Sequence, residues 1–317
     1  MDYEKEINEY LDTQDMTTNT KKGYISGFKS LQKLFNTTTI EYIKAPETTI
    51  NKIEEAYPKE NVISTKINTI LLLFKIFYLD DKDYEKYKKK FIKYRKKLIA
   101  NIKEGYAKHE ATDTQKEKAI TEEENEKITQ VLKDKIKHAT KSSMDIINIR
   151  NYLIYSFINV LHTRGDFITS KLVKFKLKFE YDTEYNYIVI YKDKTIKYIQ
   201  NNYKTKDTYG QKIHSISDDL YKWFLKLYNA YRKLELDTDY AFYQDNMITP
   251  MNPKNLSYLY SKIGLDIIGH KISLQVARVQ NASEDYDIFE AVREKAEKQG
   301  HSMDTHYMYA KKDIIKK

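Results

Sequence analysis

The chain has 317 residues, a length typical of two domains, and 55 Lys and Arg residues against 46 Asp and Glu residues give it a formal net charge of +9. This balance favours a polyanionic partner, nucleic acid before a membrane surface. The lack of cysteine excludes disulfides, thiolate metal sites and a cysteine nucleophile. The longest apolar run, Ile67 to Leu79, is too short to span a bilayer, and the acidic N-terminus is unlike a signal peptide. We therefore expect a soluble intracellular protein, in the cytoplasm or the nucleus.

Residues 1–104 predict a compact helical domain. Residues 17–35 place apolar side chains at helical spacing, and Thr17 to Thr20 offer N-caps. Residues 64–79 predict a second helix, capped by Ser64 or Thr65. A basic helix follows, with nine Lys and Arg residues from position 82 to position 97. Such a run suits a solvated helix face, and at the end of a small helical domain it also suits a helix lying along DNA phosphates.

Residues 105–118 lack apolar periodicity and are the expected linker to a second domain, residues 119–317. That domain opens on a capping pattern, Thr121 with Glu124, and continues with an apolar helix over residues 143–163. Residues 186–217 alternate like strands, with turns at residues 192–193 and 209–210. Helices are predicted over residues 218–234, 252–267 and 283–299. The expected fold class is mainly α with a small antiparallel β-sheet.

Five residues of the second domain suit one kind of chemistry. Arg164 follows the apolar helix, Lys204 lies at a hairpin, and Arg278 lies inside an apolar helical stretch, where a charge is costly unless it meets an anion. His301 and Tyr309 follow near the C-terminus. Taken singly, Arg164 also suits a partner of a helix dipole, and Arg278 also suits a buried ion pair with a carboxylate such as that of residue 287 or 290.

Cleavage of a phosphodiester by a tyrosine needs such a set. The attacking phenolate forms a phosphotyrosyl ester through a transition state with extra negative charge, and two guanidiniums hold its non-bridging oxygens in a bidentate manner. A lysine protonates the leaving 5′ oxygen, and a histidine binds the phosphate or assists proton transfer. Because the arginines supply the electrostatic stabilisation, no metal and no cofactor is required.

The order of "HTRGDF", "YKTK", "QVARVQNAS", "GHS" and a terminal tyrosine resembles that of the tyrosine recombinases, the phage-integrase superfamily. The spacing 301 − 278 = 23 is similar to that of the family, and residues 17–35 resemble the opening helix of its core-binding domain. The likeness covers nearly the whole chain. It is greatest to the divergent recombinases of Crypton-type transposons and large eukaryotic DNA viruses.

The resemblance implies a helical core-binding domain followed by a tyrosine-recombinase catalytic domain, and it assigns roles by position. Arg164 and Arg278 take the place of the catalytic arginines, and Lys204 that of the general acid. His301 takes the late histidine position. Tyr309 takes the place of the nucleophile, since a threonine precedes it by four residues as in the family's run.

Several residues depart from the family pattern or compete with these assignments. Gln275 stands where the family usually has histidine; it can donate a hydrogen bond to phosphate but cannot shuttle a proton. Asp166 falls two residues after the first arginine instead of three. The spacing 204 − 164 = 40 is long and leaves Lys206 as an alternative to Lys204. In a helix Tyr307 and Tyr309 lie about 200° apart, so only one faces the phosphate, and Tyr307 remains the fallback.

The function that the resemblance implies is site-specific DNA recombination, in which a homo-tetramer acts on two duplex sites through a 3′-phosphotyrosyl intermediate. A topoisomerase of type IB uses the same bond chemistry as a monomer. A non-catalytic DNA-binding protein derived from a recombinase is the third alternative, and Gln275 and the shifted Asp166 are its only support. A metal site at His301 and His306 lacks a third ligand at a sensible spacing.

Overall fold

The computed structural model describes residues 2–79, 81–137, 142–161, 164–174, 182–235, 240–300 and 302–303. The chain divides into two compact units, Met1–Ala111 and Thr112–Lys317. Among the described residues, no helix combines the length and the apolar character needed to cross a membrane.

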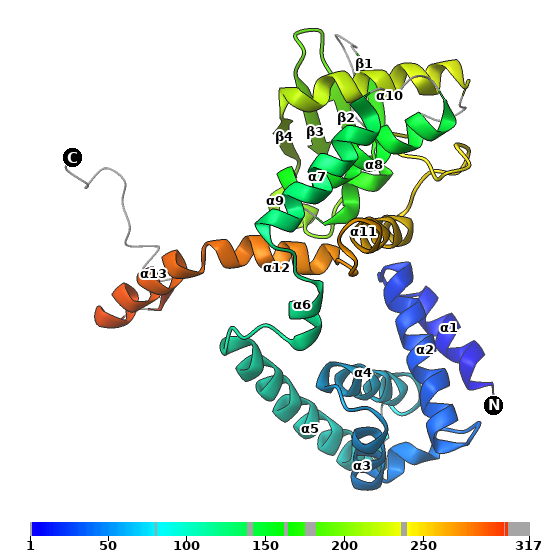
Figure 1. Ribbon diagram of the computed structural model, residues 1–317. Helices are drawn as coiled ribbons and strands as arrows, with labels where there is room; N and C mark the ends of the chain where they lie inside the picture. The colour runs from blue at the N-terminus through cyan, green and yellow to red at the C-terminus, as the bar shows by residue number, and fades with distance from the viewer. Residues whose placement is uncertain are drawn as a thin grey trace. The chain divides into compact units, whose positions relative to one another are not determined.

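The first unit is entirely helical in the part that the structure describes (Figure 1). Its elements are α1 (Tyr3–Asp12), α2 (Thr18–Phe35), the 3-10 helix η1 (Glu41–Lys44), α3 (Pro46–Ala56), α4 (Glu60–Phe77) and α5 (Lys82–Ala107). α4 contributes more buried apolar residues to this core than any other element of the unit, and it contacts both α2 and α5. Phe74 of α4 packs on Phe91 of α5, with ring centroids 5.9 Å apart.

Two helix starts in this unit show how capping and packing compete. Thr17 caps α2, because its hydroxyl accepts a hydrogen bond from the backbone N–H of Thr20, so the N-cap prediction is confirmed. The prediction that α4 begins at Ser64 or Thr65 is wrong. That helix begins at Glu60 with no side-chain cap, because Ile63 continues the apolar face and is buried.

The second unit contains most of the helices and the only sheet of the described residues. Its elements are α6 (Asp113–Lys118), α7 (Glu122–Lys137), α8 (Ser143–Leu161), η2 (Gly165–Thr169), β1 (Lys171–Lys174), β2 (Tyr187–Ile190), β3 (Ile196–Gln200), α9 (Lys206–Tyr209), β4 (Lys212–Ile216), η3 (Asp218–Leu220), α10 (Tyr221–Lys233), α11 (Pro253–Ile268), α12 (Leu274–Glu284) and α13 (Tyr286–Lys298). α6 occupies part of the expected linker and buries no side chain.

The sheet has the strand order β1-β2-β3-β4, and β2, β3 and β4 pair in antiparallel fashion as the sequence predicts. β1 differs, because it pairs with β2 in parallel, with Lys171 opposite Tyr187. The fold class is therefore mainly α with a small sheet, and the sheet is mixed instead of antiparallel. η2 and β1 also account for part of the long spacing between Arg164 and Lys204.

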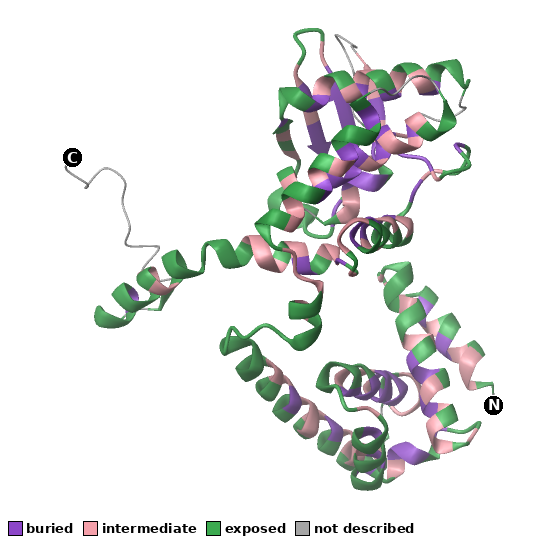
Figure 2. Cartoon of the chain, in the orientation of Figure 1, coloured by how far each residue is buried: buried purple, intermediate pink, exposed green. Residues whose placement is uncertain are grey.

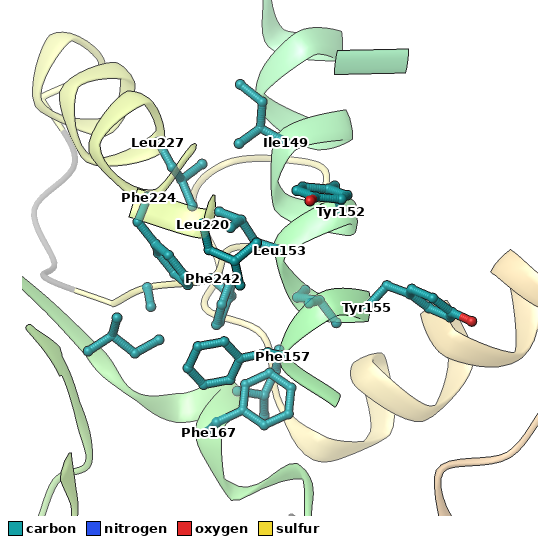
Figure 3. Close-up of a cluster of buried hydrophobic side chains, with 14 of the residues drawn as sticks. Ile149, Tyr152, Leu153, Tyr155, Phe157, Phe167, Leu220, Phe224, Leu227 and Phe242 are labelled. Carbon is teal, nitrogen blue, oxygen red and sulfur yellow. The ribbon is translucent and has the colours of Figure 1, made fainter. Parts of the chain in front are cut away.

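The core of the second unit lies between α8, α10 and the sheet. Phe157 of α8 contacts Phe167 of η2, Tyr198 of β3 and Phe224 of α10, with centroid distances of 5.1, 5.6 and 5.7 Å (Figure 3). Figure 2 shows this buried layer inside the unit, with exposed residues on the outer helices. A buried charge completes the core: Arg150 of α8 donates hydrogen bonds from its guanidinium to the backbone oxygen of Tyr243 (2.7 Å) and to nearby side chains.

Candidate functional site

Arg164 lies on the surface, immediately before a segment that is anchored in the core. It is exposed and immediately precedes η2, whose Phe167 and Ile168 are fully buried. Phe167 faces Phe157 of α8 in Figure 3. The chain can approach α11 closely at this point only through Gly165, since a Cβ there would lie 2.5 Å from the side chain of Leu256.

Arg278 lies on α12, and its environment differs from the one that the sequence indicates. The flanking apolar residues predict a buried charge, but Arg278 is exposed, and Val276 is the buried residue of this helix. The alternative of an ion pair with Glu290 is wrong, because Glu290 binds Arg293 instead at 2.8 Å. In the part of the chain that the structure describes, neither Arg278 nor Arg164 forms an ion pair.

The two arginines meet at one cavity although 278 − 164 = 114 residues separate them. The cavity has a volume of about 500 Å³, and Arg164, Gln275 and Arg278 line it. Gln275 and Arg278 share it because residues three apart lie on the same face of a helix. The other lining residues are mostly polar or basic, namely Lys118, Gly165, Ser257, Ser261, Lys271, Ile272, Ser273 and Leu274. Two cationic guanidiniums beside hydroxyl and amide groups make a site suited to an anion.

Asp166 is the acidic group of this cluster. Burial raises the pKa of its carboxyl, while the positive charges of Arg164 and Arg278 act on that pKa in the opposite direction. Both guanidiniums therefore lie close enough to act on the same carboxyl. The sequence offset of two residues, which departs from the family pattern, does not separate Asp166 from the arginines.

A further cation in the cavity comes from the end of the expected linker. Lys118 lines the cavity together with the arginines, and Ile120 fixes this part of the chain to α12. The backbone N–H of Ile120 donates to the amide oxygen of Gln280 (3.1 Å), and the amide nitrogen of Gln280 donates to the backbone oxygen of Ile120 (2.6 Å). The sequence does not single out Lys118 or Lys271, because a lysine in so basic a chain carries no local signal.

α7 begins beside this wall of the cavity. Thr121 and Glu124 form the expected capping box, in which each side chain accepts a hydrogen bond from the backbone N–H of the other residue. The second carboxylate oxygen of Glu124 lies 3.2 Å from Nε2 of His270, which precedes α12. The contact between Glu124 and His270 thus links the first turn of α7 to the segment that leads into α12.

Lys204 and Lys206 lie outside the group of residues that line the cavity. Both are exposed in the connection between β3 and β4, where Lys206 begins α9. A hydrogen bond from the Tyr203 hydroxyl to the Gly210 backbone oxygen (2.8 Å) closes this connection. His301, His306, Tyr307 and Tyr309 lie outside the described residues, so their roles remain predictions.

No protein-family model and no curated protein sequence matches the chain. Among solved structures, the crystal structure of XerA recombinase aligns over 99% of this chain and 95% of that chain, with 13% sequence identity and a TM-score of 0.36. A likeness at that score carries no conclusion about the function of this chain.

Proposed function

We propose that the chain is a tyrosine-type DNA recombinase that cleaves and rejoins strands through a 3′-phosphotyrosyl intermediate. The observation that carries the proposal is the meeting of Arg164 and Arg278 at one cavity, with Gln275 beside them. Both arginines are exposed, and neither is paired with a carboxylate in the described part of the chain. Unpaired guanidiniums that converge from distant segments suit a phosphate better than they suit a structural ion pair.

In the proposed reaction, the phenol oxygen of Tyr309 attacks the phosphorus and releases its proton to solvent water. A bond forms between phosphorus and this oxygen while the bond between phosphorus and the 5′ oxygen breaks. Lys204 donates a proton to the departing 5′ oxygen, and the arginines stabilise the charge on the non-bridging oxygens. The phosphotyrosyl ester preserves the free energy of the broken bond, so a 5′ hydroxyl from a partner strand reverses the step and joins the two strands.

DNA binding by the first unit is part of the same proposal. We assign residues 1–104 to a core-binding domain, residues 105–118 to a linker and residues 119–317 to the catalytic domain. α5 supports the assignment, because most of its basic residues are exposed and only Lys88 and Lys90 form ion pairs among the described residues of the helix. Four protomers on two duplex sites complete the proposed assembly. Because the contacts would be mainly to phosphates, the affinity should fall steeply with salt.

The test is a selection for covalent protein–DNA adducts. Duplexes with a randomised central segment and a nick on one strand are incubated with the full chain, and adducts that survive denaturing detergent are sequenced. The nick lets the short cleaved fragment diffuse away, so the adduct accumulates. We expect an adduct with wild-type protein and with Tyr307→Phe, and none with Tyr309→Phe.

Other outcomes favour the other functions. An adduct that is lost only in Tyr307→Phe moves the nucleophile to that residue. Relaxation of supercoiled DNA by monomers, without strand exchange between recovered sites, favours a type IB topoisomerase. DNA binding with no adduct on any duplex overturns the catalytic proposal and favours a non-catalytic DNA-binding protein.

A further inference from the structure

Asn186 lies at a junction of the second unit that no motif in the sequence indicates. It immediately precedes β2 and is 3% exposed. Its side-chain nitrogen donates to the backbone oxygens of Asp166 (3.2 Å) and Asn202 (2.9 Å). Its side-chain oxygen accepts from the backbone N–H groups of Asn201 (2.9 Å) and Asn202 (2.7 Å).

These four hydrogen bonds use both donors and both acceptor positions of a primary amide. Aspartate has the same shape, but it would direct a carboxylate oxygen at two backbone oxygens. Alanine would leave backbone groups of two segments without the partner that they have in the side chain of Asn186, and an unsatisfied polar group that is shielded from water destabilises the fold. Only asparagine fits this position with every group satisfied.

The segments that Asn186 joins carry the proposed catalytic groups. Asp166 follows Arg164 by two residues, and Asn202 precedes Lys204 by two residues. The base of the β3–β4 connection is also bound to the chain just before β2, since the side chain of Asn202 donates to the backbone oxygen of Glu184 (2.9 Å). The hydrogen bonds of Asn186 differ from this contact of Asn202, because one of them also reaches Asp166, in the segment that carries Arg164.

We propose that Asn186 is a positioning residue, which holds the connection that carries Lys204 against the segment that carries Arg164, so that the ammonium and the guanidinium reach the same phosphate. This inference rests on the proposed function. Lys204 lies in a surface connection and does not line the cavity of the arginines. A fixed base for this connection limits how far the lysine must move to protonate the leaving oxygen.

A change of leaving group separates this role from a structural one. Proton donation matters when the leaving group is an alkoxide. A 5′-bridging sulfur leaves as a thiolate, which needs little protonation because a thiol has a pKa of about 8.5, far below that of an alcohol. A variant that misplaces only the proton donor should therefore cleave the sulfur-containing strand at the normal rate.

The experiment compares single-turnover cleavage of a selected duplex with oxygen or sulfur at the scissile 5′ position. We expect Asn186→Ala and Lys204→Ala to cleave the oxygen substrate at least about 100-fold more slowly than wild type, as for loss of a general acid. Both should cleave the sulfur substrate within about threefold of wild type, which also shows that they are folded. Asn202→Ala is the matched control, because it removes a side-chain hydrogen bond at the same base without touching η2, and it should stay near wild type on both substrates.

Two results overturn the inference. One is equal slowing of Asn186→Ala on both substrates, and the other is a normal rate on both. If the alanine variant does not fold, Asn186→Ser, which keeps one donor and an acceptor, is measured in the same way, with the same expectation and the same overturning results. Failure of the proposed function is distinct, because wild-type protein would then form no adduct with either substrate.

Discussion

Replacement of Arg278 by lysine tests the chemical reason for two arginines. A guanidinium offers two parallel hydrogen bonds to a phosphate, and each charge-assisted bond contributes about 1.5–3 kcal/mol. Lysine keeps the charge but loses the second bond, so Arg278→Lys should slow cleavage roughly 10- to 150-fold, at 1.36 kcal/mol for each factor of ten. Arg278→Ala loses both bonds and should slow cleavage roughly 10²- to 10⁴-fold.

The fold should survive both changes. Arg278 is exposed and forms no ion pair within the described ranges, so its replacement should change the free energy of unfolding by less than about 0.5 kcal/mol. The assay is single-turnover adduct formation at saturating protein, which separates the chemical step from DNA binding. Lys222→Ala is the matched control, because it removes one positive charge from α10, on a residue that does not line the cavity.

The reasoning is refuted if Arg278→Lys cleaves as fast as wild type at saturation. It is also refuted if both Arg278 variants weaken DNA binding to the same extent as Lys222→Ala and leave the saturated rate unchanged. In either case, the cavity would bind DNA without stabilising the transition state.

Three further predictions follow from neighbouring residues. Gln275→His should add an inflection near pH 6.5 to the pH profile of the saturated cleavage rate, because imidazole titrates there and an amide does not; an unchanged profile would place residue 275 away from the phosphate. Burial raises the pKa of the Asp166 carboxyl above its ordinary value of 3.8. Ionisation of Asp166 at neutral pH therefore lowers the stability of the folded state. This loss of stability disappears as the pH falls through the raised pKa towards 3.8, below which the carboxyl is protonated in both states. Asp166→Asn should therefore raise the melting temperature at neutral pH and lose this advantage in acid, and a lower melting temperature at neutral pH would contradict the argument. Arg150→Ala should lower the free energy of unfolding in urea by about 2–5 kcal/mol, because it empties the space of a large side chain that is 2% exposed and leaves the backbone oxygen of Tyr243 without its donor. Asp245→Ala should cost less, because Asp245 is 78% exposed and Arg150 keeps its hydrogen bonds to Tyr243 and Asn151; similar losses would contradict the argument.

Local signals in the sequence predict the helix starts well where a side chain can satisfy the free N–H groups. Thr17 and Thr121 cap helices for that reason. The start of α4 could not be predicted in the same way, since burial of Ile63 extends the helix past the polar residues that resemble caps. Burial depends on neighbours that are distant in sequence, and no local pattern contains them.

The sheet and the site show the same limit. β1 has four residues without an alternating burial pattern, so nothing local distinguishes parallel from antiparallel pairing. Arg164, Gln275 and Arg278 were found from their order along the chain, and the structure brings them to one cavity. The exposure of Arg278 cannot be predicted from the sequence, because apolar flanking residues do not show which face of a helix is covered. Asn186 gave no signal at all, since its partners are backbone atoms of other segments.

The reciprocal pairing of Gln280 with Ile120 has a practical consequence for dissecting the chain. A fragment that starts at residue 112 retains this pairing and keeps Lys118 beside the arginines. A fragment trimmed to the first residue of α7, Glu122, loses both and exposes the amide of Gln280 on the helix that holds Arg278. A fragment made to study the second unit alone should therefore begin well before α7, so that the cavity of Arg164 and Arg278 keeps all of its lining residues.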